Sequence, residues 1–214
     1  KEPVGAGADT CCKLHIFLYD DKKECVVKTE TAYTEAETEL KIIAPKLWSA
    51  EEPNLYTLYI EVTDSDDTVT EVIKQRIGFR HFAMENGIMC LNGKRIVFRG
   101  VNRHELSCDH GRSVTKKEIL HDLLIMKQNN INAIRTCHYP DTSLIYQLCD
   151  EYGIYMIDET NLESHGSWDV AEFTKDYTHV VPHNKPEWLD MMLDRANSMY
   201  QSCLLYTSDA ADDK

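Results

Sequence analysis

The sequence has 214 residues, which is enough for one or two domains, and its 43% hydrophobic and 28% charged residues are typical of a globular chain. A formal net charge of −13 argues against nucleic acid or an anionic membrane surface as a partner, because both attract basic patches. No apolar run reaches the roughly 20 residues that a membrane helix needs. We therefore expect neither nucleic acid nor a membrane as a partner.

The eight cysteines form no Cys-x-x-Cys pair and have no zinc-like spacing. Several lie in apolar stretches, where a thiol is usually a small core residue, so we expect reduced cysteines and a cytoplasmic protein. The chain opens at Lys1 without a methionine, and we expect that this is not the natural start. Residues 203–212 are similar to a translated end tag from a sequencing library. We predict that residues 203–214 are a non-native tail without packed contacts; a frayed acidic terminus is the alternative.

Residues 1–85 are predicted to be β structure. Short apolar or β-branched runs are separated by polar turns and indicate strands at 13–19, 24–29, 39–43, 55–63 and 68–77. Strands at this spacing without intervening helices favour an antiparallel sandwich. Two tight turns are expected next, at Asn86-Gly87 and Asn92-Gly93, because positive φ is accessible to both residue types.

From residue 86 to 202 the pattern changes to alternating strands and helices. Strands are predicted at 95–101, 131–136 and 154–159, and helices at 115–130 and 141–152; a long loop then leads to a last helix near Pro186. Thr115 and Glu118 have the spacing of a capping box, and Gly153 is placed to end the second helix. This order is the opening of a doubly wound sheet or of an eight-stranded barrel.

Polar residues follow each of these three strands, in the segments 102–105, 135–140 and 158–166. Parallel barrels place their sites at the carboxyl ends of strands, so we predict one pocket there. Structural roles are the alternatives: Arg135 could be a buried, paired arginine that ties strands together, and His138 could be a turn residue. Glu163 and His165 would point the same way in an extended segment, and could share a cation with a third ligand from elsewhere.

Many of these segments together resemble family 2 glycoside hydrolases along nearly all of residues 1–202. The motifs that carry the resemblance are Leu47-Trp48-Ser49, Pro53-Asn54-Leu55-Tyr56, Ile77-Gly78-Phe79-Arg80, Leu91-Asn92-Gly93-Lys94, Gly100-Val101-Asn102-Arg103-His104-Glu105, Met126-Lys127-Gln128-Asn129-Asn130, Arg135-Thr136-Cys137-His138-Tyr139-Pro140, Leu148-Cys149-Asp150-Glu151-Tyr152-Gly153 and Asp158-Glu159-Thr160-Asn161. The resemblance implies a multidomain β plus α/β protein. Residues 1–85 would be part of an immunoglobulin-like β-sandwich, and residues 86–202 the first three βα units of a truncated TIM (β/α)8 barrel.

The segment Asn161-Leu162-Glu163-Ser164-His165-Gly166 is similar to the magnesium-binding segment of the family's bacterial β-galactosidases. The resemblance thus implies a parent enzyme, a homo-oligomer, that hydrolyses terminal non-reducing β-D-galactose residues by a retaining two-carboxylate mechanism. A β-glucuronidase, a β-mannosidase or a non-catalytic carbohydrate-binding module are the alternatives.

Residue roles follow from the same resemblance. It implies His104 and His138 as transition-state and substrate contacts, Arg135 as the residue that orients the nucleophile, and Asn102 and Asn161 as substrate-binding residues. Glu163 and His165 would be Mg²⁺ ligands, with Na⁺ as a second candidate cation. The family's acid/base and nucleophile glutamates are expected beyond residue 202, so the chain by itself is expected to be inactive.

Overall fold

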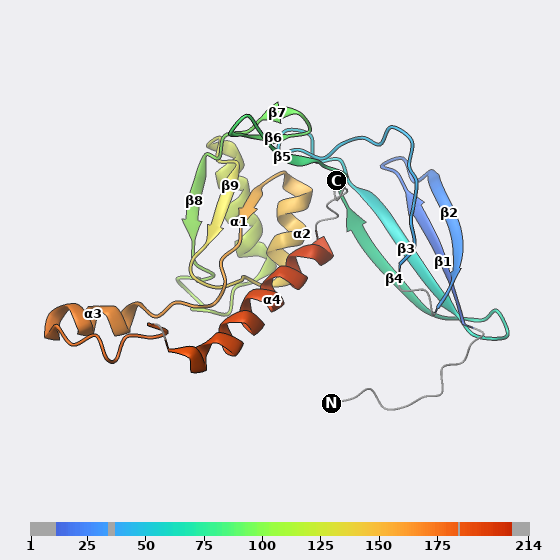
Figure 1. Cartoon of the computed structure of the whole chain (residues 1–214). Coiled ribbons are helices and arrows are strands. Elements are labelled where there is room, and N and C mark those ends of the chain that lie inside the picture. Colours follow the sequence, from blue (N-terminus) through green and yellow to red (C-terminus); the bar gives the residue numbers. More distant parts are fainter. Residues whose placement is uncertain (1–11, 34–36, 184, 207–214) are drawn as a thin grey trace.

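The computed structural model describes residues 12–33, 37–183 and 185–206, with the side chains of the last helix described as far as residue 201. The N-terminal part is a four-stranded antiparallel sheet in the order β2-β1-β3-β4. Its strands are β1 (Lys13–Tyr19), β2 (Cys25–Ala32), β3 (Tyr56–Thr63) and β4 (Val69–Ile77). Four of the five expected strands are therefore present and antiparallel, and the described residues supply one layer of the expected sandwich (Figure 1).

The strand predicted at residues 39–43 is wrong. The described residues there belong to no strand, and the side chain of Ile43 is 95% exposed. An apolar β-branched run forms a strand only where a neighbouring strand pairs with its backbone, and the described residues provide none at this position.

Two consecutive tight hairpins form a small sheet between the N-terminal and C-terminal parts. Its strands are β5 (Phe82–Glu85), β6 (Ile88–Leu91) and β7 (Lys94–Arg95). Asn86, Gly87, Asn92 and Gly93 all have positive φ, between 51° and 77°, so both turn predictions are confirmed.

The C-terminal part contains a parallel sheet in the order β10-β9-β8, formed by β8 (Gly100–Arg103), β9 (Ala133–Thr136) and β10 (Tyr155–Ile157). β9 pairs in parallel with both neighbours, as predicted. The first strand was predicted too early, at 95–101. Residues 96–99 instead connect β7 to β8, and Ile96 and Phe98 pack on a cluster that includes Leu91 and Tyr155.

Helices α1 and α2 connect these parallel strands, and three further helices follow β10 within the described residues. They are α1 (Lys116–Gln128), α2 (Ser143–Tyr152), α3 (His165–Thr174), the short 3-10 helix η1 (Pro186–Trp188) and α4 (Leu189–Tyr206). The capping box of Thr115 and Glu118 begins α1, and Gly153 in the left-handed conformation ends α2. Both predictions are confirmed. The core between sheet and helices contains Ile119, Leu123, Ile134, Ile145 and Ile154, each at most 2% exposed.

The segment after β10 was predicted as a long loop, but it contains α3. Ala171 is the one buried residue of this helix, and the N-cap residue Ser164 makes no side-chain capping bond. The sequence therefore shows neither a buried apolar stripe nor a capping signal. In Figure 1, α3 protrudes from the body of the molecule.

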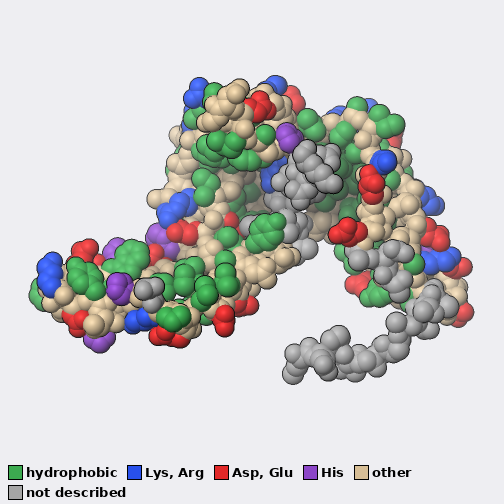
Figure 2. Space-filling model, viewed as in Figure 1, with side chains coloured by type: hydrophobic (Ala, Val, Ile, Leu, Met, Phe, Trp, Pro, Cys, Tyr) green, Lys and Arg blue, Asp and Glu red, His purple; other side chains and the backbone are tan. Residues whose placement is uncertain are grey.

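Apolar side chains lie on the surface of α3 and α4. Figure 2 shows hydrophobic side chains gathered over these helices, and Phe173 is 92% exposed. Apolar surface of this kind marks contact or aggregation sites. None of the helices in the described ranges combines the length and apolarity that a membrane crossing requires.

The backbone of α4 continues through Tyr206, into the segment that was predicted to be a non-native tail. Its side chains beyond residue 201 and all of residues 207–214 lie outside the described residues. The prediction about packed contacts in this tail therefore stays a prediction.

Residues around Trp48 pack beneath the parallel sheet. Trp48 and Ala50 form a buried cluster with Leu91, Ala133 and Tyr155. The indole Nε1 of Trp48 donates to the backbone carbonyl of Asp150, at 2.8 Å. This cluster and the β5–β7 sheet lie at the amino ends of β8–β10, so the carboxyl ends face away from them (Figure 1).

We expect Gly153→Ala to destabilise the protein more than Gly87→Ala. Both glycines have positive φ, but a Cβ at Gly153 would collide with the backbone of Ala50, whereas nothing lies within 4 Å at Gly87. The extra loss should be about 1–3 kcal/mol, the usual range for overpacking. Urea unfolding of the two variants measures it. Equal losses of unfolding free energy in the two variants would show that the loop around Ala50 can move to make room for the added Cβ.

Candidate active site

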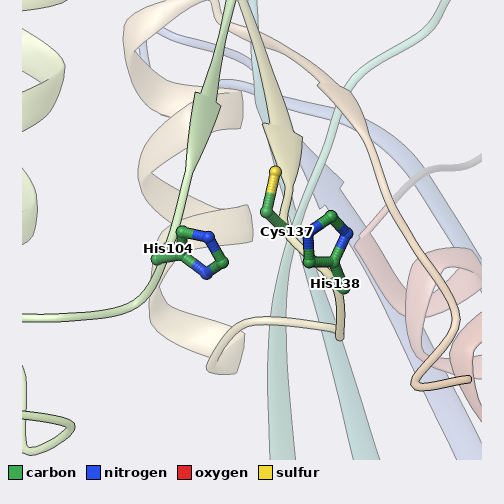
Figure 3. Close-up of side chains that lie close together, drawn as sticks. All are labelled: His104, Cys137 and His138. Atoms are coloured by element: carbon green, nitrogen blue, oxygen red, sulfur yellow. The ribbon is translucent and has the colours of Figure 1, made fainter. Parts of the chain in front are cut away.

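The candidate site lies at the carboxyl ends of the three parallel strands. His104 directly follows β8, Cys137 and His138 directly follow β9, and Glu159 follows β10. Parallel pairing of β9 with both neighbours brings these strand ends to one edge of the sheet. Figure 3 shows His104, Cys137 and His138 at this edge.

Arg135, the third residue of β9, is the centre of the polar contacts. Its guanidinium Nη2 lies 2.8 Å from the Glu159 carboxylate and 3.5 Å from His138 Nδ1. Its Nη1 donates to Asn102 Oδ1 at 3.4 Å and to Cys137 Sγ at 3.2 Å. A planar guanidinium has five donors and can hold several partners at fixed angles, so Arg135 orients groups from all three strand ends.

The two predicted sugar-contacting histidines lie together. The rings of His104 and His138 meet edge to face, with centroids 5.6 Å apart. The ring centroid of Tyr139 lies 6.3 Å from that of His104. The Arg112 guanidinium covers the Tyr139 ring at 5.1 Å. Imidazole and aromatic groups in this arrangement offer hydrogen-bond donors and a flat apolar face, both of which suit a sugar ring.

Two ion pairs of the buried Arg103 hold the loops that carry the histidines. Arg103, which precedes His104, donates through Nη1 to Asp141 Oδ2 at 2.8 Å and through Nε to Asp122 Oδ2 at 3.2 Å. The side chains of Arg103 and Asp141 are 5% and 0% exposed. Burial raises the pKa of Asp141 to about 6, although the nearby Arg103 lowers it. This pair ties the end of β8 to the loop between β9 and α2.

A second network joins β9 to β10. The hydroxyl of Thr136 donates to Asp158 Oδ1 at 2.9 Å, and the hydroxyl of Tyr146 donates to Asp158 Oδ2 at 2.7 Å. The backbone N–H of Glu159 donates to Thr136 Oγ1 at 2.9 Å. These bonds fix the backbone of Glu159, and thereby the position of its carboxylate beside Arg135.

Glu163 and His165 do not point the same way, contrary to the prediction. Glu163 Oε2 lies 3.5 Å from His138 Nδ1, and Glu163 Oε1 accepts from the backbone N–H of His165. His165 begins α3 instead of lying in an extended segment, and its Nε2 is 3.1 Å from Asp169 Oδ1, one helical turn later. The two side chains therefore have different partners here, and magnesium binding by this pair stays a prediction.

The structure brings some of the predicted residues together and separates others. His104, Arg135 and His138 form one group, which Asn102 joins through Arg135 and Glu163 joins through His138. Glu163 and His165 also line a pocket of about 400 Å³ between the start of α3 and α4, whose lining includes neither His104 nor His138. Asn161 is exposed, and its backbone carbonyl accepts from Arg195 Nη1 at 2.6 Å. The prediction of a single pocket around His104, His138, Glu163 and His165 stays a prediction.

Sequence reasoning did not assign Glu159 and Cys137 to the site. Glu159 makes the shortest contacts of Arg135 within the group, and Cys137 lies beside both histidines although its side chain is buried. Their position in the sequence could have indicated this role, because both residues follow the carboxyl ends of buried strands and are next to residues that were assigned to the site.

A parallel α/β sheet with arginine, histidine and carboxylate groups at its carboxyl end has the organisation of the site in TIM-barrel folds. The family model described as "Glycosyl hydrolases family 2, TIM barrel domain" matches residues 82–204, and the model "Glycosyl hydrolases family 2" matches residues 6–80. The chain belongs to family 2 of the glycosyl hydrolases.

Individual relatives carry two different names. A β-galactosidase of Clostridium acetobutylicum is 59% identical over 156 residues, which is 72% of this chain and 17% of that protein. One from Halalkalibacterium halodurans is 48% identical over 186 residues, which is 86% of this chain and 18% of that protein. The chain thus spans less than a fifth of the length of these relatives.

The similar solved structures include β-glucuronidases. The enzyme of Bifidobacterium dentium in complex with coumarin-3-O-glucuronide has a TM-score of 0.65 at 27% identity, over 69% of this chain and 24% of that chain. The enzyme of Ruminococcus gnavus in complex with a C6-substituted uronic isofagomine has a TM-score of 0.63 at 30% identity, over 69% and 24%.

Proposed function

We propose that this chain is part of a β-galactosidase that releases terminal non-reducing β-D-galactose residues. The observation that carries the proposal is the 59% identity to a protein named β-galactosidase, against 27–30% identity to the structurally similar β-glucuronidases. That alignment covers 72% of this chain. The small-molecule substrate is then a neutral galactoside.

In this proposal the chain supplies part of the wall of the sugar site. His104 and His138 donate hydrogen bonds to sugar hydroxyls, and Asn102 and Asn161 contribute amide groups to substrate binding. Such bonds strengthen as the oxocarbenium-like transition state develops. Arg135 orients a carboxylate, because a planar guanidinium holds carboxylate oxygens at fixed angles.

The reaction itself needs two carboxylates about 5–5.5 Å apart, one as nucleophile and one as acid/base. Glu159 is engaged by Arg135 and His138, and Glu105 Oε1 accepts from the Thr142 hydroxyl at 2.8 Å. We assign the reacting carboxylates to neither of these residues. The proposal places them in the remainder of the full-length protein.

The assignment of the two parts of the chain to domains forms part of the same proposal. Residues 1–85 would be one part of an immunoglobulin-like sandwich, and residues 86–202 the first three βα units of the barrel. Val72 and Ile73, neighbours on β4 that point to opposite faces, are both exposed, so apolar surface remains on each face of the sheet and a second layer would cover one of them. A homo-oligomeric parent enzyme in the cytoplasm is the accompanying proposal.

Substrate choice tests the function directly. The full-length protein that carries this chain should hydrolyse a chromogenic β-galactoside at least about tenfold faster, in kcat/KM, than the matching β-glucuronide or β-mannoside; tenfold corresponds to about 1.4 kcal/mol of transition-state binding. The 214-residue chain alone should show no turnover above a His138→Ala control. Preference for the glucuronide or the mannoside would overturn the assignment, and turnover by the chain alone would overturn the placement of the reacting carboxylates.

Magnesium binding by Glu163 and His165 stays a separate prediction. The activity of the full-length protein should fall on chelation and return with added Mg²⁺, and Glu163→Gln should need more Mg²⁺ for the same activity. Activity that is indifferent to chelation would contradict this prediction, and the same titration with Na⁺ tests the second cation.

A further inference from the structure

We propose that His104, Cys137 and His138 bind a soft divalent metal ion such as Zn²⁺, a ligand set different from the Glu163 and His165 predicted for magnesium. Each of the three residues offers one ligand atom, and these atoms all lie within 4.8 Å of one another. Figure 3 shows the two imidazoles and the sulfur together at the ends of β8 and β9.

The chemistry of the donors selects the metal. Two imidazole nitrogens and one sulfur are the ligand types of zinc, whereas magnesium requires oxygen ligands. Tetrahedral zinc with three protein ligands leaves a fourth position for water. On binding, the Cys137 thiol loses its proton to the buffer and the sulfur becomes a thiolate ligand; no electrons are transferred.

The surrounding charges favour a cation. Arg135 donates to Cys137 Sγ, but its positive charge is balanced by Glu159, at 2.8 Å. A second carboxylate, that of Glu163, lies 3.5 Å from His138 Nδ1. One arginine and two glutamates leave one unit of negative charge beside the three ligands, and the thiolate adds another.

The scaffold holds the ligands nearly in place before binding. Cys137 is 2% exposed and comes from the same strand end as His138, while the buried Arg103–Asp141 pair fixes the end of β8 that precedes His104. His138 Nδ1 is 3.2 Å from Glu159, and a carboxylate beside an imidazole ligand is a frequent means of orienting it.

The effect of zinc on enzyme activity rests on the proposed function. If His104 and His138 contact the sugar, a metal ion held by the same side chains excludes the sugar, and Zn²⁺ inhibits the full-length enzyme. Metal binding itself depends on the geometry alone.

Cobalt titration of the untagged, reduced 214-residue chain tests the binding. Co²⁺ should bind with release of a proton and give the visible bands of a tetrahedral site together with a sulfur-to-cobalt charge-transfer band. One equivalent of Zn²⁺ should then displace the Co²⁺, and Zn²⁺ added to the metal-free chain should likewise release a proton. Excess Mg²⁺ should leave the spectrum unchanged. Absence of the charge-transfer band, or zinc binding without proton release, would overturn the proposal.

Matched variants locate the site. Cys137→Ser should abolish the sulfur band. His104→Gln or His138→Gln should weaken binding by about 10–100-fold or more, since even a change at a residue that only hydrogen-bonds to a metal ligand has an effect of that size. The controls are Cys25→Ser, an exposed thiol on β2, and His179→Gln, an exposed histidine; both should bind as the unaltered chain does. His104 is exposed, so its variant should fold even if Cys137→Ser does not. A band that survives in folded Cys137→Ser, or is lost in Cys25→Ser, would refute the assignment.

Inhibition of the full-length protein distinguishes the two proposals. Zn²⁺ should inhibit hydrolysis of a chromogenic β-galactoside, and Cys137→Ser should relieve the inhibition by at least about tenfold in zinc concentration. A full-length protein without galactosidase activity would refute the proposed function while the cobalt spectra still decide the metal site.

Discussion

Arg135→Lys is expected to reduce kcat of the full-length protein toward a chromogenic β-galactoside by about 10²–10³-fold, the loss typical of one preorganised electrostatic contact. Arg135 contacts Glu159, His138, Asn102 and Cys137 through two terminal nitrogens. A lysine keeps the charge but has a single nitrogen and cannot reproduce this planar arrangement. Because the positioning is needed most in the transition state, kcat should fall more than KM rises.

The control for this prediction is another arginine–glutamate pair. Arg76 Nη1 lies 3.3 Å from Glu151, on the surface and away from the strand ends, with both side chains more than 40% exposed. Exposed pairs contribute at most about 1 kcal/mol to stability, so Arg76→Lys should leave the kinetics within a few-fold of the unaltered protein. If Arg135→Lys also stayed within that range, Arg135 would be a structural residue without a role in positioning.

Asp141→Ala is expected to destabilise the chain by about 3–5 kcal/mol, because it leaves the Arg103 guanidinium buried without its closest partner. Arg103 Nη2 already has no hydrogen-bond partner among the described residues, and Asp141 is fully buried. Urea unfolding monitored by circular dichroism measures the change. The matched control is Asp122→Ala, which removes the second carboxylate from the same arginine.

Asp122 is 42% exposed and bonds to the Nε of Arg103 at 3.2 Å. Solvent can replace an exposed carboxylate, so Asp122→Ala should cost at most about 1 kcal/mol. Equal effects of the two variants would show that water reaches Arg103 and that the pair with Asp141 is not a buried one.

Stability should depend on pH through Asp141. Burial raises the pKa of this carboxyl to about 6 in the folded chain, above its ordinary value of 3.8. A carboxyl with a raised folded pKa favours folding when it is protonated. Its contribution is therefore complete below about pH 4 and is lost as the pH rises through about 6. Asp141→Asn should remove this part of the pH dependence; a parallel decline in the variant would assign it to other groups.

Local chemistry in the sequence determined much of the fold. Asn86-Gly87 and Asn92-Gly93 predict turns because these residues adopt positive φ at little cost, and Thr115 with Glu118 predicts a helix start because the two side chains satisfy exposed N–H groups. The structure contains all of these features. The polar residues after three buried strands predicted where the site lies, because parallel strands end at one edge.

Tertiary packing decided what local signals could not. Residues 39–43 have the composition of a strand and do not form one, while α3 forms without a buried stripe. A strand requires a partner from elsewhere in the chain, and a helix can form wherever its backbone bonds close locally. Neither condition can be read from apolar periodicity alone.

The same limit applies to the site. The sequence placed Glu163 and His165 side by side, on the assumption of an extended backbone; the start of α3 at His165 turns the imidazole toward Asp169 instead. The contacts of Arg135 with Glu159 and of His104 with His138 join residues from different strand ends. Sequence patterns establish which residues reach the strand ends, because the alternation of β and α structure is local. Which side chains meet there depends on strand order and backbone direction, which the folded sheet alone determines.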